Sequence, residues 1–197
     1  CHQTTRDCSR LRRCVASGMY DQEWTSTPPG ALAADGMDPF FQAPRSGPHM
    51  ITIIRLGCGA CAHTLLALEQ IRAEWKKTGR HTVLLVQGET PQTHQATHLA
   101  FSIYKKHGFG TFWRELPALH HAVEAPDDLP AIARRNQIPI TSIPTTPVGR
   151  LPAELAQEGV ETVPVVVIDQ RPLEGARKPE QYRRWLELAA KERKGKE

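Results

Sequence analysis

The sequence lacks several features that would by themselves decide its function. No apolar run is long enough to span a bilayer as a helix. Aromatic residues make up only 6% of the 197 residues, and the net charge of +4 includes no basic stripe interleaved with aromatics, so we expect no nucleic-acid partner. The glycines form no phosphate-binding loop, and no Ser-His-Asp signature is present. The cysteines are therefore the main source of chemistry.

Cysteine is scarce and unevenly placed. The five cysteines are Cys1, Cys8, Cys14, Cys58 and Cys61. In an oxidising compartment Cys8 and Cys14 could close a small structural disulfide, and the alternatives are two free thiols or a metal site with His2. The close Cys-x-x-Cys spacing of zinc sites is missing from this pair, so we expect no metal.

The chain begins at Cys1 rather than at Met. Bacterial lipoproteins are cleaved directly before a cysteine, which then carries the lipid, and the alternative is a start that falls on Cys by chance. We expect Cys1 to be a lipid-attachment site, which would tether the protein to a membrane surface without spanning it. That location would lie outside the cytosol, where disulfides persist.

The pattern along the chain predicts an α/β domain with appendages. Residues 1–49 contain many prolines and no sustained periodicity, which predicts an extended N-terminal arm. A buried strand over 50–56, an amphipathic helix over 59–77 and a second strand over 82–87 predict a βαβ unit. The main domain covers 50–190, with a helical insertion at about 92–158 and a basic tail over 191–197. The elements predicted after the βαβ unit are helices over 96–107, 112–123, 127–136 and 151–158, strands over 163–169 and 172–175, and a final helix over 178–191.

The motif Cys58-Gly59-Ala60-Cys61 lies between the first strand and its helix. This context favours a redox pair. Cys58 would sit at the helix N-terminus, where unpaired backbone N–H groups and the helix dipole favour the thiolate that attacks disulfides. Cys61 would lie one turn inward, shielded and able to resolve a mixed disulfide. The alternatives are a structural disulfide, half of a zinc site, or two buried thiols.

A second signal is Val163-Pro164 at the start of an apolar strand. Proline is disfavoured in a central strand because it has no N–H donor. Its position predicts a turn, with a cis peptide bond as one option and a trans proline at a strand edge as the other.

The order of these elements resembles the DsbA family of bacterial periplasmic oxidoreductases, over about residues 50–190. The residues that carry the resemblance are Cys58-Gly59-Ala60-Cys61, Phe112-Trp113, Asp127-Asp128-Leu129, Gly159 to Pro164, and Glu174-Gly175-Ala176. The resemblance implies a thioredoxin-like fold with an inserted helical subdomain, Cys58 as nucleophile and Cys61 as resolving thiol. It also implies that Val163 and Pro164 bind protein substrates with thiols or disulfides, that a redox partner protein resets the pair, and that no cofactor is needed.

The motif departs from that of the strongly oxidising members of the family. They carry Pro-His between the cysteines, where this chain has Gly-Ala, so Cys58 could be a weaker thiolate. Arg55 could compensate through its charge and tune Cys58, or it could be a solvated residue at the strand end. Oxidase, reductase and isomerase roles are not separated by these residues.

The sequence also leaves room for other functions and sites. The chain could instead be an envelope-tethered lipoprotein in which the fold serves as a binding scaffold or assembly factor of a secretion machine. A glutathione-linked transferase or isomerase would need a glutathione site that the sequence does not reveal. His120 and His121 could bind a metal or act as a pH switch, but their place in a polar helical region predicts surface histidines.

Overall fold

The computed structural model describes residues 37–41, 48–75, 79–86, 88–145, 162–169 and 171–194. Several predictions concern other residues. The lipid-attachment site at Cys1, the pairing of Cys8 with Cys14, the helix over 151–158 and the last residues of the basic tail lie outside the described ranges.

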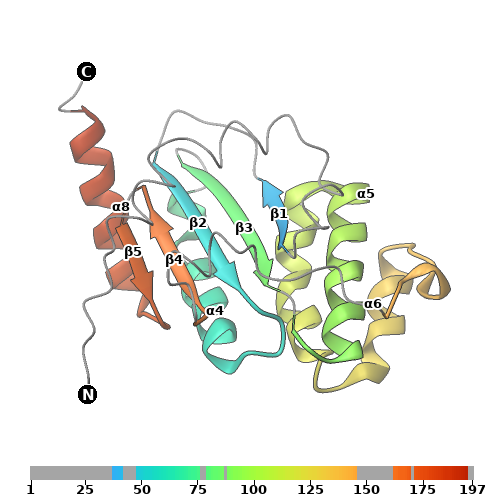
Figure 1. Ribbon diagram of the computed structural model, residues 1–197. Coiled ribbons are helices and arrows are strands. Elements are labelled where there is room, and N and C mark those ends of the chain that lie inside the picture. Colours follow the sequence, from blue (N-terminus) through green and yellow to red (C-terminus); the bar gives the residue numbers. More distant parts are fainter. Residues whose placement is uncertain are drawn as a thin grey trace, which may run out of the picture.

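A five-stranded sheet with the order β1-β3-β2-β4-β5 forms the centre of the fold (Figure 1). The predicted βαβ unit is confirmed, because β2 and β3 are parallel neighbours joined through helix α4. All the other strand pairs are antiparallel. The strands are β1 (Met37–Phe41), β2 (His49–Ile54), β3 (Arg80–Val86), β4 (Val165–Ile168) and β5 (Arg171–Glu174).

Strand β1 lies inside residues 1–49, for which the sequence predicted an extended arm without a strand. It pairs antiparallel with β3, and Pro39 stands opposite Leu84. A proline within a five-residue strand is unusual, because proline cannot donate to the ladder. An edge strand tolerates that loss, since only one of its sides is paired, and β1 is the last strand at its edge of the sheet.

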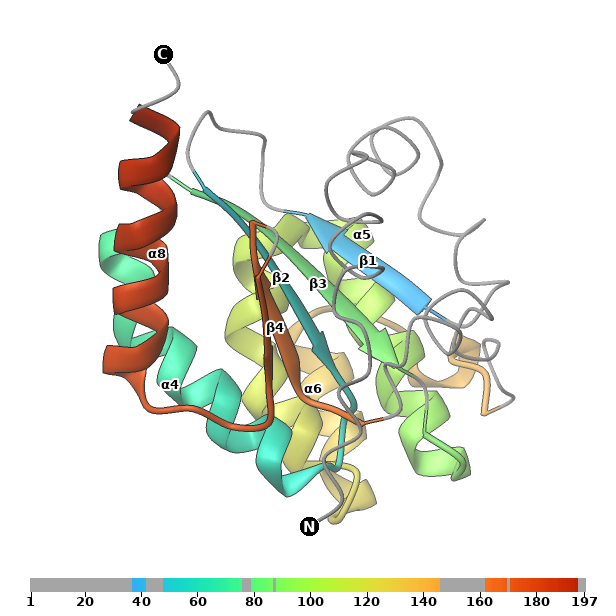
Figure 2. The ribbon, with the colours of Figure 1, turned by 60° about the vertical axis from the view of Figure 1, so that its left-hand side comes forward.

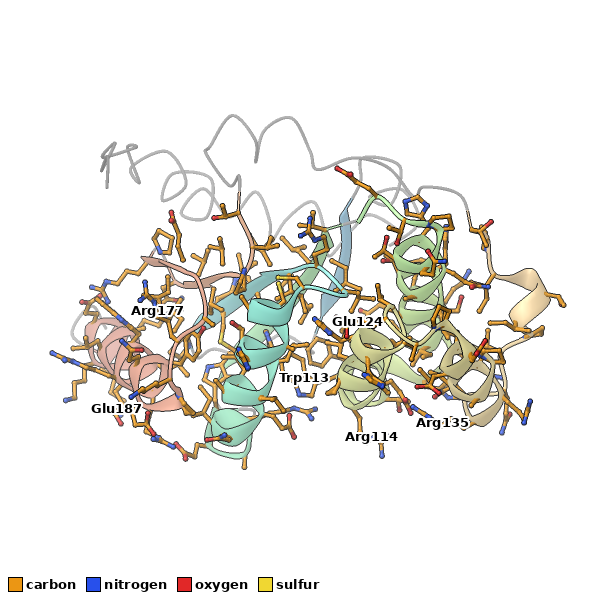
Figure 3. All side chains as sticks on the ribbon, turned by 90° about the horizontal axis from the view of Figure 1, so that it is seen from below. Trp113, Arg114, Glu124, Arg135, Arg177 and Glu187 are labelled. Atoms are coloured by element: carbon orange, nitrogen blue, oxygen red, sulfur yellow. The ribbon has the colours of Figure 1, made fainter. Side chains whose placement is uncertain are left out.

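Helices α4, α5 and α8 lie on the same face of the sheet (Figure 3). Alternate residues of the central strands, among them Met50, Ile54, Val83 and Val166, point into the core that these helices cover. Helices α4 and α8 run side by side (Figure 2). Arg183 of α8 forms an ion pair with Glu74 of α4. The helices are α4 (Gly59–Trp75), α5 (Pro91–His121), α6 (Leu129–Arg135) and α8 (Pro179–Lys194), with 3-10 turns at Pro126–Asp128 and Ile140–Ser142.

Helix α5 differs most from its prediction. Instead of two helices over 96–107 and 112–123, one helical run begins at Pro91 and bends at Gly108, whose φ of 74° and ψ of −180° are not helical. Its start is fixed by Thr90, whose side chain accepts from the backbone N–H of Thr93 while the Thr93 hydroxyl accepts from the backbone N–H of Thr90. Gly108 lies between the two predicted helices and marks a kink in one helical run rather than a gap between two.

None of the helices in the described ranges combines the length and the apolar character needed to cross a bilayer.

Candidate active site

The turn between β2 and α4 holds the cysteine motif in place. Gly57 has a φ of +79°, a backbone conformation that favours glycine. A Cβ at this position would lie 2.7 Å from Cγ1 of Val123, just beyond the end of α5. Both the backbone angle and the space therefore require glycine, and the turn is packed directly against the helical insertion.

Cys58 is the last residue before α4 and is half-buried. Its carbonyl oxygen accepts from the backbone N–H of Cys61 at 2.8 Å and from that of Ala62 at 3.1 Å, which are the first hydrogen bonds of the helix. Its sulfur therefore lies at the N-terminal end of a 17-residue helix, where free N–H groups and the dipole favour an anion. In the thiol form, the S–H of Cys58 donates to the carbonyl oxygen of Val163 at 3.9 Å.

Cys61 occupies a different environment one turn further on. It is 0% exposed and belongs to the hydrophobic core. Its sulfur accepts from the backbone N–H of Arg55 at 3.5 Å. Burial raises the pKa of the Cys61 thiol well above its usual value, and the neighbouring Cys58 side chain raises it further. No disulfide joins the two cysteines in the structure, and Cys58 is partly exposed whereas Cys61 is buried.

Val163 and Pro164 lie beside Cys58, although more than 100 positions separate them from it in the sequence. The peptide bond between them is cis, one of the two options that the sequence left open. Pro164 is buried directly before β4, and its carbonyl oxygen accepts from the backbone N–H of Gly175 at 2.8 Å. Because β4 pairs antiparallel with β2, the start of β4 and the turn before it lie at the end of β2, next to Cys58.

Arg55 reaches this site through its backbone, because its side chain is exposed and its N–H contacts Cys61. Its effect on Cys58 stays a prediction. The structure thus gathers Arg55, Cys58, Cys61 and Val163 around two sulfur atoms, while Cys1, Cys8 and Cys14 are outside the described ranges.

The prediction of a surface position was wrong for His120. This residue is only 7% exposed, and its Nε2 lies 2.8 Å from the carbonyl oxygen of Cys58. A carbonyl can only accept, so Nε2 must carry the hydrogen. The side chain of His121, in contrast, is 69% exposed. Helical spacing could have separated the two, because His120 follows the buried Leu116 by four residues and so lies on the inner face of α5.

The described residues include no group of three or more His, Cys, Asp or Glu side chains arranged to hold a metal ion.

Comparison with known proteins gives the fold an independent reference. The sequence matches no protein-family model and no curated protein. The thiol–disulfide exchange protein α-DsbA2 of Wolbachia pipientis superposes with a TM-score of 0.59 at 13% identity, over 92% of this chain and 96% of that one. The catalytic domain of Proteus mirabilis ScsC superposes with a TM-score of 0.59 at 15% sequence identity, over 91% of this chain and 98% of that one. A periplasmic thioredoxin-like protein from Salmonella enterica serovar Typhimurium superposes with a TM-score of 0.58 at 14% sequence identity, over 85% of this chain and 94% of that one.

At these low identities the likeness is one of fold. It confirms the predicted α/β architecture, with a helical region inserted into a thioredoxin-like domain. The chain thus has the thioredoxin-like fold of the DsbA- and ScsC-type proteins.

Proposed function

We propose that the chain is a thiol–disulfide oxidoreductase that acts on protein substrates through Cys58 and Cys61. The observation that carries the proposal is the difference between the two cysteines. Cys58 is partly exposed at a helix N-terminus, and Cys61 is buried one turn later with a raised pKa. An attacking thiol needs access and thiolate character, whereas a resolving thiol has to stay protonated and shielded until the first step is complete.

The chemistry runs in two exchanges. The thiolate of Cys58 attacks one sulfur of a substrate disulfide, forming a mixed disulfide and releasing the other substrate sulfur as a thiolate that takes up a proton. Cys61 then loses its proton and attacks the sulfur of Cys58, which releases the second substrate thiol and leaves a Cys58–Cys61 disulfide. Two electrons have passed to the substrate, and a redox partner protein returns the pair to its starting state. The reverse sequence oxidises a substrate dithiol.

The backbone at Val163 supports a role in substrate binding. Its carbonyl oxygen faces the sulfur of Cys58. A substrate chain whose backbone N–H donates to this oxygen would lie beside the reactive sulfur in an extended conformation, as in strand addition. Val163 and Pro164 would then hold the substrate while the exchange takes place.

The cellular location belongs to the same proposal. A solved structure with this fold is a periplasmic protein, and lipid attachment at Cys1 would tether the chain to the envelope membrane. Disulfides form and persist in oxidising compartments such as the periplasm, where a protein of this activity would find its substrates.

The test compares the wild type with Cys58→Ala and Cys61→Ala in insulin reduction and in oxidative refolding of a reduced protein. We expect both activities to need Cys58, and we expect Cys61→Ala to accumulate a substrate mixed disulfide at Cys58 that mass spectrometry detects. Cys58→Ala should trap none. If the wild type is inactive in both assays and Cys61→Ala traps no mixed disulfide, the proposal fails and a scaffold role takes its place.

The direction of electron flow is read from the reduction potential of the Cys58–Cys61 pair. A value near about −120 mV indicates an oxidant and one near about −270 mV a reductant.

A further inference from the structure

The carbonyl group of Cys58 is held from outside its own helix. Besides the two backbone N–H groups of α4, its oxygen contacts Nε2 of His120 at 2.8 Å. These two residues are 62 positions apart in the chain, and His120 belongs to the last turn of α5. The contact therefore joins the helical insertion to the reactive cysteine.

A second contact supports the first. Val123 lies so close to Gly57 that a Cβ added there would be 2.7 Å from Cγ1. The end of α5, the segment that leads to the labelled Glu124 in Figure 3, is therefore packed against the residue before Cys58 as well as hydrogen-bonded to Cys58 itself. The position of the cysteine turn thus depends on this segment in addition to the sheet.

The His120 hydrogen bond has a chemical consequence for the sulfur. The Nε2–H group points its positive end at the carbonyl oxygen of Cys58, so the protein places a fixed partial positive charge beside the residue whose sulfur has to become an anion. A thiolate gains from this charge, but a neutral disulfide does not. The interaction therefore favours the reduced state of the pair over the oxidised one.

We propose that His120 is a positioning residue that orients the Cys58 carbonyl and stabilises the Cys58 thiolate through its Nε2–H group. This inference rests on the proposed function, because it assigns the helical insertion a part in setting the redox properties of the cysteine pair. It assigns His120, which is 7% exposed, an action through Cys58 rather than on the substrate. It also supplies a donor to a motif that carries Gly59-Ala60 and no histidine between its cysteines.

Three substitutions at His120 separate this role from a merely structural one. The amide nitrogen of Gln takes the place of Nε2, whereas that of Asn reaches only as far as Nδ1, and Ala offers no donor. His121→Ala is the matched control, because it removes an exposed histidine from the adjacent position. Circular dichroism and thermal unfolding show which variants are folded, and the pair His120→Gln and His120→Asn keeps the test valid if His120→Ala does not fold.

Two readouts are measured for each variant. The first is the equilibrium constant for exchange of the Cys58–Cys61 pair with glutathione. The second is the rate at which iodoacetamide alkylates Cys58 at pH 7, quantified on the Cys58 peptide by mass spectrometry, which does not require the protein to act as an oxidoreductase.

We expect His120→Ala and His120→Asn to make the disulfide three- to tenfold more stable against glutathione, where tenfold corresponds to about 30 mV. The alkylation rate should fall by a similar factor, while His120→Gln and His121→Ala stay near the wild type. The proposal is overturned if His120→Ala or His120→Asn matches His121→Ala, or if His120→Gln matches His120→Asn, in the alkylation rate. Inactivity of the wild type in both insulin reduction and oxidative refolding, with no mixed disulfide on Cys61→Ala, would reject the proposed function alone, because the alkylation comparison still decides the role of His120.

Discussion

Replacing Gly57 by alanine tests how tightly the helical insertion is packed on the cysteine turn. Gly57 combines a φ of +79° with the 2.7 Å approach to Cγ1 of Val123 described above. Alanine would meet both obstacles, whereas alanine at Gly175, which has a φ of +73° and open space around its Cα among the described residues, would meet only the first.

The two costs can be worked out separately. A left-handed backbone angle costs a non-glycine residue about 1–2 kcal/mol. Forcing a methyl group into a packed contact costs about 1–3 kcal/mol more. We therefore expect Gly57→Ala to lower the free energy of unfolding by about 2–5 kcal/mol and Gly175→Ala by about 1–2 kcal/mol. The larger loss would be a substantial part of the roughly 5–15 kcal/mol that stabilise a typical domain.

Urea unfolding followed by circular dichroism measures these losses, and Val123→Ala completes a double-mutant cycle. In the Val123→Ala background the added Cβ no longer meets Cγ1, although Cβ of residue 123 remains 3.2 Å away. Gly57→Ala should therefore cost less there than in the wild type, with a coupling of about 1–2 kcal/mol. Equal losses in both backgrounds, or a Gly57→Ala protein as stable as Gly175→Ala, would refute the packing argument.

Two further predictions concern acid stability. Burial holds the pKa of His81 well below its usual value, with the charges of His49 and Arg72 acting in the same direction. Only the unfolded chain then binds this proton, so below pH 6.5 the free energy of unfolding should fall by up to about 1.4 kcal/mol per pH unit, and His81→Leu should lose that slope while a variant of the exposed His63 keeps it. Burial disfavours the charge of Asp169, but the Arg193 guanidinium and the His49 backbone N–H outweigh it and hold the pKa below its usual value. The stabilisation from the ionised Asp169 is therefore present above about pH 3.9 and is lost as the pH falls through the lower pKa of the folded state. Asp169→Asn should lower the free energy of unfolding, measured in urea, by about 1–2 kcal/mol at pH 7 and by little at pH 2. An equal loss at both pH values would contradict this.

The parts of the site with local signals could be predicted from the sequence. The cysteine motif lies at a change from strand to helical periodicity, and Pro164 precedes a run of β-branched residues. Each signal lies within a few residues of the feature it marks. The relative placement of the two came from the resemblance to a family, since no local pattern states that β4 pairs with β2.

The parts that were missed depend on tertiary contacts. The contact of His120 with Cys58 spans 62 positions and follows from the way α5 returns to the cysteine turn. Strand β1 forms because β3 offers it a partner, despite Pro39. The continuation of α5 through Gly108 likewise depends on packing, because the flanking residues Ile103, Phe109 and Phe112 are all buried in the common core.

The two outer strands bear on how the protein avoids unwanted association. β1 and β5 end the sheet, and each carries a proline, Pro39 in one and Pro172 in the other. A polypeptide that approaches either edge meets a residue with no N–H to offer, and β5 adds the charges of Arg171 and Glu174. Edges of this kind discourage exposed strands of other chains from extending the sheet into an aggregate.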